Sequence, residues 1–127
     1  MDKKYIELFK DLAQATAATA ESVMDYDRQK GDEKGLETAT IMRDDYQELA
    51  GRIDVTEYVI SKNDAAKFLV AAMIQANQLQ DRINNLKKAM TGYQTDVIPK
   101  LQAVVEAEDD EAAVKIAEEK FIIENKE

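Results

Sequence analysis

The pattern of apolar residues along the chain predicts four long helical segments. In the first, apolar and small residues recur three and four positions apart, as they do on the packed face of a helix in a bundle or coiled coil. This stripe comprises Tyr5, Leu8, Leu12, Ala15, Thr19, Ser22 and Tyr26. Gly31 then provides a residue that readily takes the left-handed conformation of a helix end, and Asp32 is a suitable cap for the next helix.

The second segment repeats this spacing, with Gly51 inside the pattern. Its apolar face comprises Leu36, Ala39, Met42, Tyr46, Leu49, Ile53 and Ile60. Ser61, followed three residues later by Asp64, resembles a capping box, so we expect a new helix to begin there. An uninterrupted rod through the second and third segments is the alternative.

The third segment has the most regular pattern and ends at Thr91 and Gly92. Its main stripe comprises Ala65, Leu69, Ala72, Ala76, Leu79, Ile83, Leu86, Met90 and Tyr93. A second apolar face comprises Ala66, Val70, Met73 and Ile74, with Phe68 between the two faces. A helix that is apolar on nearly every side is usually covered by neighbours on several sides, which predicts a central position.

The fourth segment begins near Asp96, with Pro99 in its first turn, where a missing N–H is tolerated. Its core face consists of Leu101, Val104 and Val105. The acidic residues within 106–111 repel one another, so we expect the helix to kink or break near residues 108–111. Asp109 or Asp110 would cap a last helix, whose apolar face comprises Ala113, Ile116, Ala117 and Phe121.

Four segments of similar length with short connections predict an all-α fold, an antiparallel up-down bundle of about four helices with the last one kinked or broken. The composition agrees, because 127 residues with four Gly and one Pro contain few helix breakers. We treat residues 1–127 as a single domain with an acidic C-terminal segment, residues 106–127.

The residue types present exclude most catalytic and metal chemistry. The chain has no His and no Cys, which removes the imidazole bases, the thiolate nucleophiles and the usual zinc ligands. Asp25, Asp27 and Gln29 match the first ligand positions of a calcium loop, but Lys30 replaces the required Gly and Leu36 stands where the bidentate Glu belongs. We therefore expect a non-enzymatic protein without a metal or cofactor.

The formal net charge of −9 argues against binding to nucleic acids or to anionic lipid surfaces, since both require cationic protein surface. The longest apolar run, residues 68–74, falls far short of the ~20 residues that span a bilayer. No apolar signal-peptide core is present in the sequence given. These features favour a cytoplasmic protein.

The acidic C-terminal segment suggests one function, binding to a protein partner or to a second copy of the chain. Residues 106–127 contain nine acidic residues and three lysines, yet they include the run Phe121, Ile122 and Ile123. One helical face cannot bury three consecutive apolar residues, so we expect part of this run to stay exposed as an apolar anchor for a partner; a frayed helix end with one exposed apolar residue is the alternative. The neighbouring carboxylates would steer a basic partner toward it: Glu106, Glu108, Asp109, Asp110 and Glu111.

The small residues between Ala13 and Ala20 suggest a different function, small-molecule binding. They either allow close helix packing or leave a cavity in the bundle core. The residues that would line such a cavity are Ala15, Thr19, Ser22, Tyr46, Ala72 and Ala76. Hydroxyl groups on a helix often donate to the carbonyl four residues earlier, which would leave them less available to a ligand.

Overall fold

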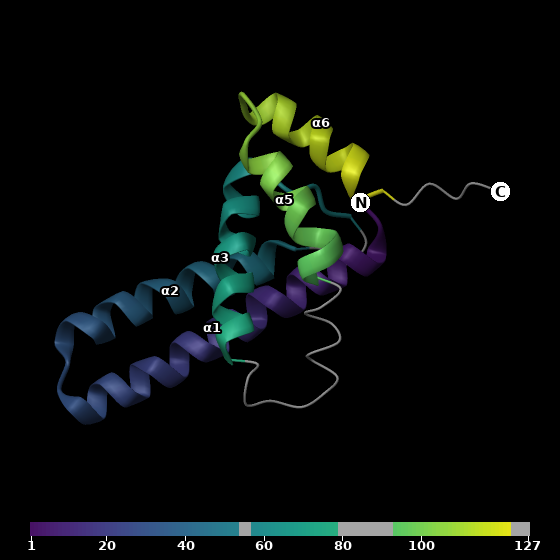
Figure 1. Ribbon diagram of the computed structural model, residues 1–127. Helices are drawn as coiled ribbons and strands as arrows, with labels where there is room; N and C mark the ends of the chain where they lie inside the picture. Colours follow the sequence, from purple (N-terminus) through teal and green to yellow (C-terminus); the bar gives the residue numbers. More distant parts are fainter. Residues whose placement is uncertain (54–56, 79–92, 123–127) are drawn as a thin grey trace.

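The computed structural model describes residues 1–53, 57–78 and 93–122, and these residues form helices without any strand (Figure 1). The helices are α1 (Lys3–Lys30), α2 (Glu33–Arg52), α3 (Lys62–Gln78), the π-helical turn η2 (Tyr93–Val97), α5 (Ile98–Val105) and α6 (Asp110–Lys120). The predicted all-α bundle is confirmed. Its last part is divided into the short elements η2, α5 and α6, and the gap between α5 and α6 lies at the kink or break predicted near residues 108–111.

Helices α1 and α2 form an antiparallel hairpin with the predicted turn (Figure 1). Gly31 has a φ of 73°, the left-handed conformation that glycine adopts without strain. The backbone N–H of Asp32 donates to the carbonyl of Asp27 at 2.9 Å, and the Asp32 carboxylate accepts from the N–H of Gly35 at 2.9 Å. The predicted helix end at Gly31 and cap at Asp32 are confirmed.

The buried face of α1 differs from the predicted stripe. The residues that pack inward are Tyr5, Ile6, Phe9, Leu12, Ala13, Thr16, Ala17, Ala20, Met24 and Asp27. Ser22 is exposed and Tyr26 is 58 % exposed, so the prediction for these two residues is wrong. Both stripes share Tyr5 and Leu12, but the observed one also carries Ile6, Phe9 and Met24, and burying this larger apolar surface is more stabilising.

Helices α2 and α3 are separate, as the capping signal predicted. Helix α2 ends at Arg52, several residues before the expected end near Ile60, and Gly51 lies in its last turn. Ser61 Oγ accepts from the N–H of Asp64 at 3.1 Å, at the start of α3. The Asp64 carboxylate does not complete a capping box, because it accepts hydrogen bonds from Tyr58 Oη at 2.7 Å and from Arg52.

Helix α3 is covered on fewer sides than its pattern predicted. Ala65, Phe68 and Ala72 are buried, whereas Val70 is 48 % and Met73 is 68 % exposed. The main contacts of α3 are with α1 and α5, and on its second apolar face Ala66 and Ile74 are partly buried whereas Val70 and Met73 are exposed. The predicted continuation of this helix through Leu79, Ile83, Leu86 and Met90 lies outside the described residues.

The core lies where α3, α5 and α6 pack around the first half of α1. Phe9 stacks on Phe68 with ring centroids 4.4 Å apart, and Phe121 packs edge-on against Tyr5 and Phe9. Asp109 Oδ1 accepts from the N–H of Ala112 at 2.7 Å, which confirms the predicted break and cap before α6. Ala113, Ala117 and Phe121 are buried as predicted, and Ile116 is partly buried against the core.

The second half of α1 and the first half of α2 extend beyond the other helices (Figure 1). We call residues 20–42, the outer half of the hairpin, the arm. Gln75 marks its inner limit, since the Gln75 amide donates to Thr19 Oγ1 at 3.1 Å. Among the described residues, the arm therefore consists of α1 and α2 alone, whereas the rest of the hairpin packs against α3.

Candidate functional site

The arm carries a groove between its two helices. The groove has a volume of about 660 Å³ and is bounded at its inner end by Ile74 of α3. Its remaining lining residues are Thr19, Ala20, Val23, Asp27, Asp32, Lys34, Gly35, Thr38, Ala39 and Met42. Ala20 and Ala39 are buried between the helices, so small side chains form the floor while Val23 and Met42 form the walls.

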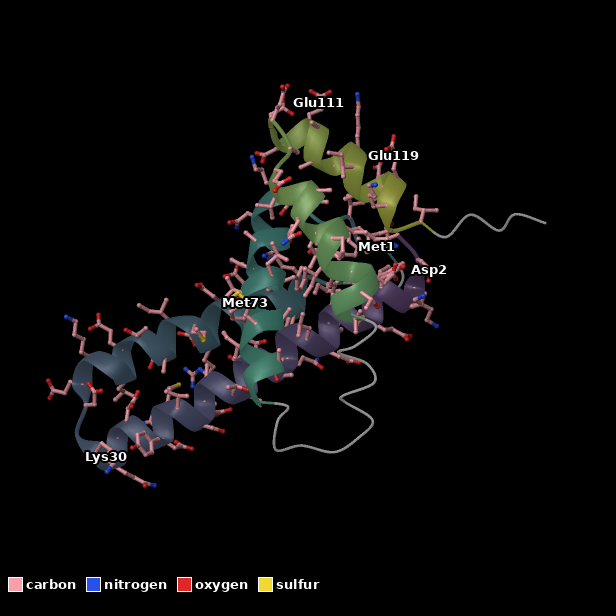
Figure 2. The ribbon with its side chains drawn as sticks, viewed as in Figure 1. Met1, Asp2, Lys30, Met73, Glu111 and Glu119 are labelled. Atoms are coloured by element: carbon pink, nitrogen blue, oxygen red, sulfur yellow. The ribbon has the colours of Figure 1, made fainter. Side chains whose placement is uncertain are left out.

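Apolar side chains remain exposed around this groove. Val23 is 43 % exposed, and Tyr26 and Ile41 on the two helices of the arm are each more than half exposed. Met73 projects from α3 on the side that faces the arm, and Lys30 marks the outer tip (Figure 2). A concentration of exposed apolar side chains beside a groove is typical of a binding surface.

The outer end of the groove is acidic. Asp27 lines the groove and is 8 % exposed, although it carries a carboxylate. A Cβ atom added to Gly35 would lie 2.8 Å from Asp27 Oδ2 and 2.6 Å from Asp32 Oδ2. A side chain at position 35 would fill the space between the two carboxylates. Because this residue is Gly35, the space stays open and both carboxylates face it.

The Asp27 carboxylate has no partner within the described parts of the chain. Asp32 caps α2 through Gly35, but no hydrogen bond or ion pair joins Asp27 Oδ1 or Oδ2 to a described residue. Arg28 pairs with Asp25 at 3.2 Å, and Lys30 lies 5.7 Å from the centroid of the Tyr26 ring. Arg28 and Lys30, the cations nearest to Asp27 in the sequence, therefore interact with other residues.

The threonines at the inner end of the arm form a local hydrogen-bonded group. Thr16 and Thr19 donate to the carbonyls of Leu12 and Ala15, which is the self-satisfied arrangement that the sequence predicted. Their oxygens also accept from the amide of Gln75, which is 4 % exposed. This group links α1 to α3 and has no free donor for a ligand.

The predicted cavity residues do not surround one enclosed space. Thr19 lines the groove, while Tyr46 and Ala72 are buried in packed positions, and Tyr46 Oη donates to the carbonyl of Lys67 at 2.8 Å. Ala15 and Ala76 are partly buried, and Ser22 is exposed on the outside of α1. The small residues between Ala13 and Ala20 serve mainly as close packing between α1 and α2, because Ala13, Ala17 and Ala20 are all buried.

The residues of the predicted partner contact lie in different environments in the structure. Phe121 is 0 % exposed and belongs to the core, so it is not a surface anchor. Ile122 is 49 % exposed, and Ile123 lies outside the described residues. The five predicted carboxylates are exposed, but Asp109 is engaged as the cap of α6. Phe121 is buried because it fills the space between Tyr5 and Phe9 at the end of α6.

Two clusters of titratable groups lie away from the groove. In the first, burial and the hydrogen bond to Asp64 raise the pKa of Tyr58. In the second, Tyr5 Oη donates to Asp96 at 2.6 Å and Lys100 Nζ lies 3.0 Å from the same carboxylate, and together these contacts lower the pKa of Asp96. Each cluster joins two segments of the chain, so its role is to hold these segments together.

Within residues 1–53, 57–78 and 93–122, no group of three or more acidic residues is placed to hold a metal ion. The calcium-loop positions Asp25, Asp27 and Gln29 are part of the continuous helix α1. A helix directs Asp25 and Asp27 to different sides, since two residues apart are about 200° apart around its axis.

Sequence reasoning missed the groove although its residues were visible. Ala20, Val23 and Asp27 are spaced three and four apart on α1, as are Gly35, Ala39 and Met42 on α2. The available signal was an apolar stripe that ends on an acidic residue, Asp27, immediately before the turn. The predicted stripe of α1 instead ended on Ser22 and Tyr26, which face away from the groove floor.

None of the helices in the described ranges is long and apolar enough to cross a membrane. Neither a family model, nor a curated protein, nor a solved structure matches this chain.

Proposed function

We propose that the protein is a non-enzymatic interaction module that binds a segment of another polypeptide in the groove of the arm. The observation that carries this proposal is the open groove of about 660 Å³ between α1 and α2, with apolar walls at Val23 and Met42. Because these walls stay in contact with water in the free protein, covering them with apolar partner side chains is favourable.

The shape of the groove favours a polypeptide segment. Two antiparallel helices that flank a shallow apolar channel can accept one face of a third helix, whose side chains enter at positions three and four apart. Exposed Ile41 and Tyr26 on the arm and Met73 on α3 would enlarge the contact beyond the groove. A partner helix would thereby complete the packing that the arm lacks.

A small-molecule ligand is the second candidate, and the volume of the groove favours it. Drug-sized ligands occupy pockets of about 300–1,000 Å³, a range that includes this groove. Such ligands usually lose most of their surface to the pocket, however, and a wall residue such as Val23 that is 43 % exposed gives little enclosure. A polypeptide is therefore the better fit.

The absence of enzymatic activity, the cytoplasmic location and self-association through exposed Ile122 are parts of the same proposal. The lack of His and Cys supports the first part. Cell fractionation tests the location, and native mass spectrometry of the wild type and of Ile122→Ser tests self-association. A native mass that stays at one chain over a hundredfold range of concentration would remove self-association from the proposal.

The proposal is tested by substituting a groove residue and a matched control. Val23 and Val59 are both 43 % exposed, but Val59 does not line the groove. We expect wild type and Val59→Glu, immobilised at equal density, to retain a protein from lysate that Val23→Glu loses. Retention by all three proteins, or by none, would contradict binding through the groove. Circular dichroism of each variant checks that the helices are intact.

A further inference from the structure

We infer that the partner segment is a basic amphipathic helix, and that one of its Lys or Arg side chains binds the Asp27 carboxylate. This inference rests on the proposed function, because it assigns a chemistry to the occupant of the same groove. Asp27 lines the groove and is 8 % exposed, and its carboxylate has no hydrogen bond or ion pair with any described residue.

A carboxylate in this position favours a cationic ligand. Removing a charged group from water is unfavourable unless an opposite charge or hydrogen-bond donors replace the water. Asp32 Oδ2 faces the same point as Asp27 Oδ2, so two negative groups meet at this end of the groove. A single guanidinium or ammonium group placed there would interact with both.

The charge of the arm supports a basic partner. Residues 20–42 contain six acidic and three basic residues. Arg28 is paired with Asp25 and Lys30 lies over Tyr26, which leaves Lys34 as the cation that lines the groove. A second copy of this acidic chain is a poor occupant, since two arms would bring like charges together.

The spacing in the groove sets the pattern of the ligand. Thr19, Val23 and Asp27 follow one another at intervals of four residues, so the apolar wall and the acidic end lie within about 12 Å along α1. A partner helix with two apolar residues four positions apart, and a cation three or four residues further on, spans about the same distance along the groove. Its apolar residues would lie toward Ile74 and its cation toward Asp27.

The probe for this inference is a fluorescein-labelled helical peptide that carries Leu, Leu and Lys at positions i, i+4 and i+8 in a background of Ala and Gln. A second peptide has Gln in place of the Lys. Asp27→Asn removes the proposed anion with almost no change of shape. Asp11→Asn is the control, because Asp11 is exposed on the same helix and does not line the groove.

We expect fluorescence anisotropy to show that Asp27→Asn weakens binding of the Lys peptide about tenfold or more, the effect typical of a lost charge-assisted hydrogen bond. Asp11→Asn should bind like the wild type. The Gln peptide should bind wild type and Asp27→Asn with the same, weaker affinity. Raising the salt concentration should weaken binding of the Lys peptide to the wild type toward that of the Gln peptide, and it should leave binding of the Gln peptide unchanged.

Equal binding of the Lys peptide to wild type and Asp27→Asn overturns the assignment of a basic ligand. If Val23→Ser nevertheless weakens that binding, the groove still binds polypeptides and the proposed function stands. If the wild type binds neither peptide, the basic-helix inference fails, while the lysate comparison of Val23→Glu with Val59→Glu judges the proposed function separately. Thermal unfolding of each variant, followed by circular dichroism, excludes loss of the fold as the cause.

Discussion

The two ends of the α1–α2 hairpin are packed in different ways. At the inner end, α1 carries Ile6 and Phe9, which are both fully buried, and Phe9 packs against Phe68 of α3 and Phe121 after α6. At the outer end, Ala20 and Ala39 are buried between the two helices, and Val23 stays 43 % exposed among the described residues. The same helix therefore contributes to a core at one end and to an open groove at the other.

This difference shows how a small helical protein can leave apolar side chains exposed without losing its fold. Large side chains at one end supply apolar burial from several helices, which stabilises the whole chain. The arm can then expose apolar side chains, because its two helices are held by the core at their inner ends. On α1, the buried ring of Phe9 and the exposed side chain of Val23 are about four helical turns apart.

The largest expected effect is on the free energy of unfolding, when a buried side chain is truncated to Ala at each end of the hairpin. Phe9→Ala should lower the free energy of unfolding by about 3–5 kcal/mol, because it removes a ring that stacks on Phe68 and leaves a cavity in the core. Met24→Ala in the arm should lower it by about 2 kcal/mol, because Met24 is buried but lies outside the main core cluster and stacks on no aromatic ring there. Urea unfolding followed by circular dichroism measures both values, and equal losses would contradict the comparison.

A smaller effect concerns the buried tyrosines of the inner end at high pH. Burial, with the nearby charge of Asp45, raises the pKa of Tyr46 to about 12, and burial with the Asp64 hydrogen bond raises that of Tyr58. The unfolded chain thus loses these protons first, near pH 10. Stability is complete below about pH 10 and should fall above it by about 1.4 kcal/mol per pH unit for each tyrosine.

Urea unfolding between pH 9 and pH 11.5 measures this dependence. Tyr46→Phe and Tyr58→Phe should each make the decline less steep. Tyr26→Phe in the arm is the control, because that side chain is 58 % exposed and its substitution should leave the decline unchanged. A decline of the same slope in all three variants would show that these buried hydroxyls are not its source.

The smallest effect tests the turn at the tip of the arm. Asp32→Ala removes the side-chain cap that accepts from the N–H of Gly35, so it should lower the free energy of unfolding by about 1 kcal/mol. Hydrogen exchange should accelerate in the first turn of α2 and stay unchanged in α5. Asp44→Ala, which removes an exposed carboxylate from the same helix, should change stability by less than about 0.5 kcal/mol.

Local signals in the sequence predicted much of the fold. Gly31 and Asp32 fixed the first turn, Ser61 began α3, and Asp109 began α6, because each relies on hydrogen bonds to residues only a few positions away. Such bonds form within one or two turns of chain and do not depend on distant neighbours. The carboxylates around residues 106–111 likewise marked the break before α6.

The candidate site was less predictable, because it depends on which helices cover which faces. The apolar pattern of α1 allowed two stripes, and only the contacts of Phe9 with Phe68 and Phe121 select the one that includes Ala20, Met24 and Asp27. Phe121 was equally ambiguous, since an apolar residue beside carboxylates can be a surface anchor or a core residue. Its position between Tyr5 and Phe9 depends on the fold of the whole chain.

The sequence by itself determined that the protein is helical, where most of its described helices begin, and that His- and Cys-based chemistry is absent, because these properties follow from residue types and short-range spacing. Only the tertiary structure decided that the hairpin extends beyond α3, that Phe121 lies in the core, and that Asp27 faces a groove without a partner. These features arise from contacts between residues far apart in the chain, where side-chain volume and the number of covering helices select one arrangement among several that the pattern allows.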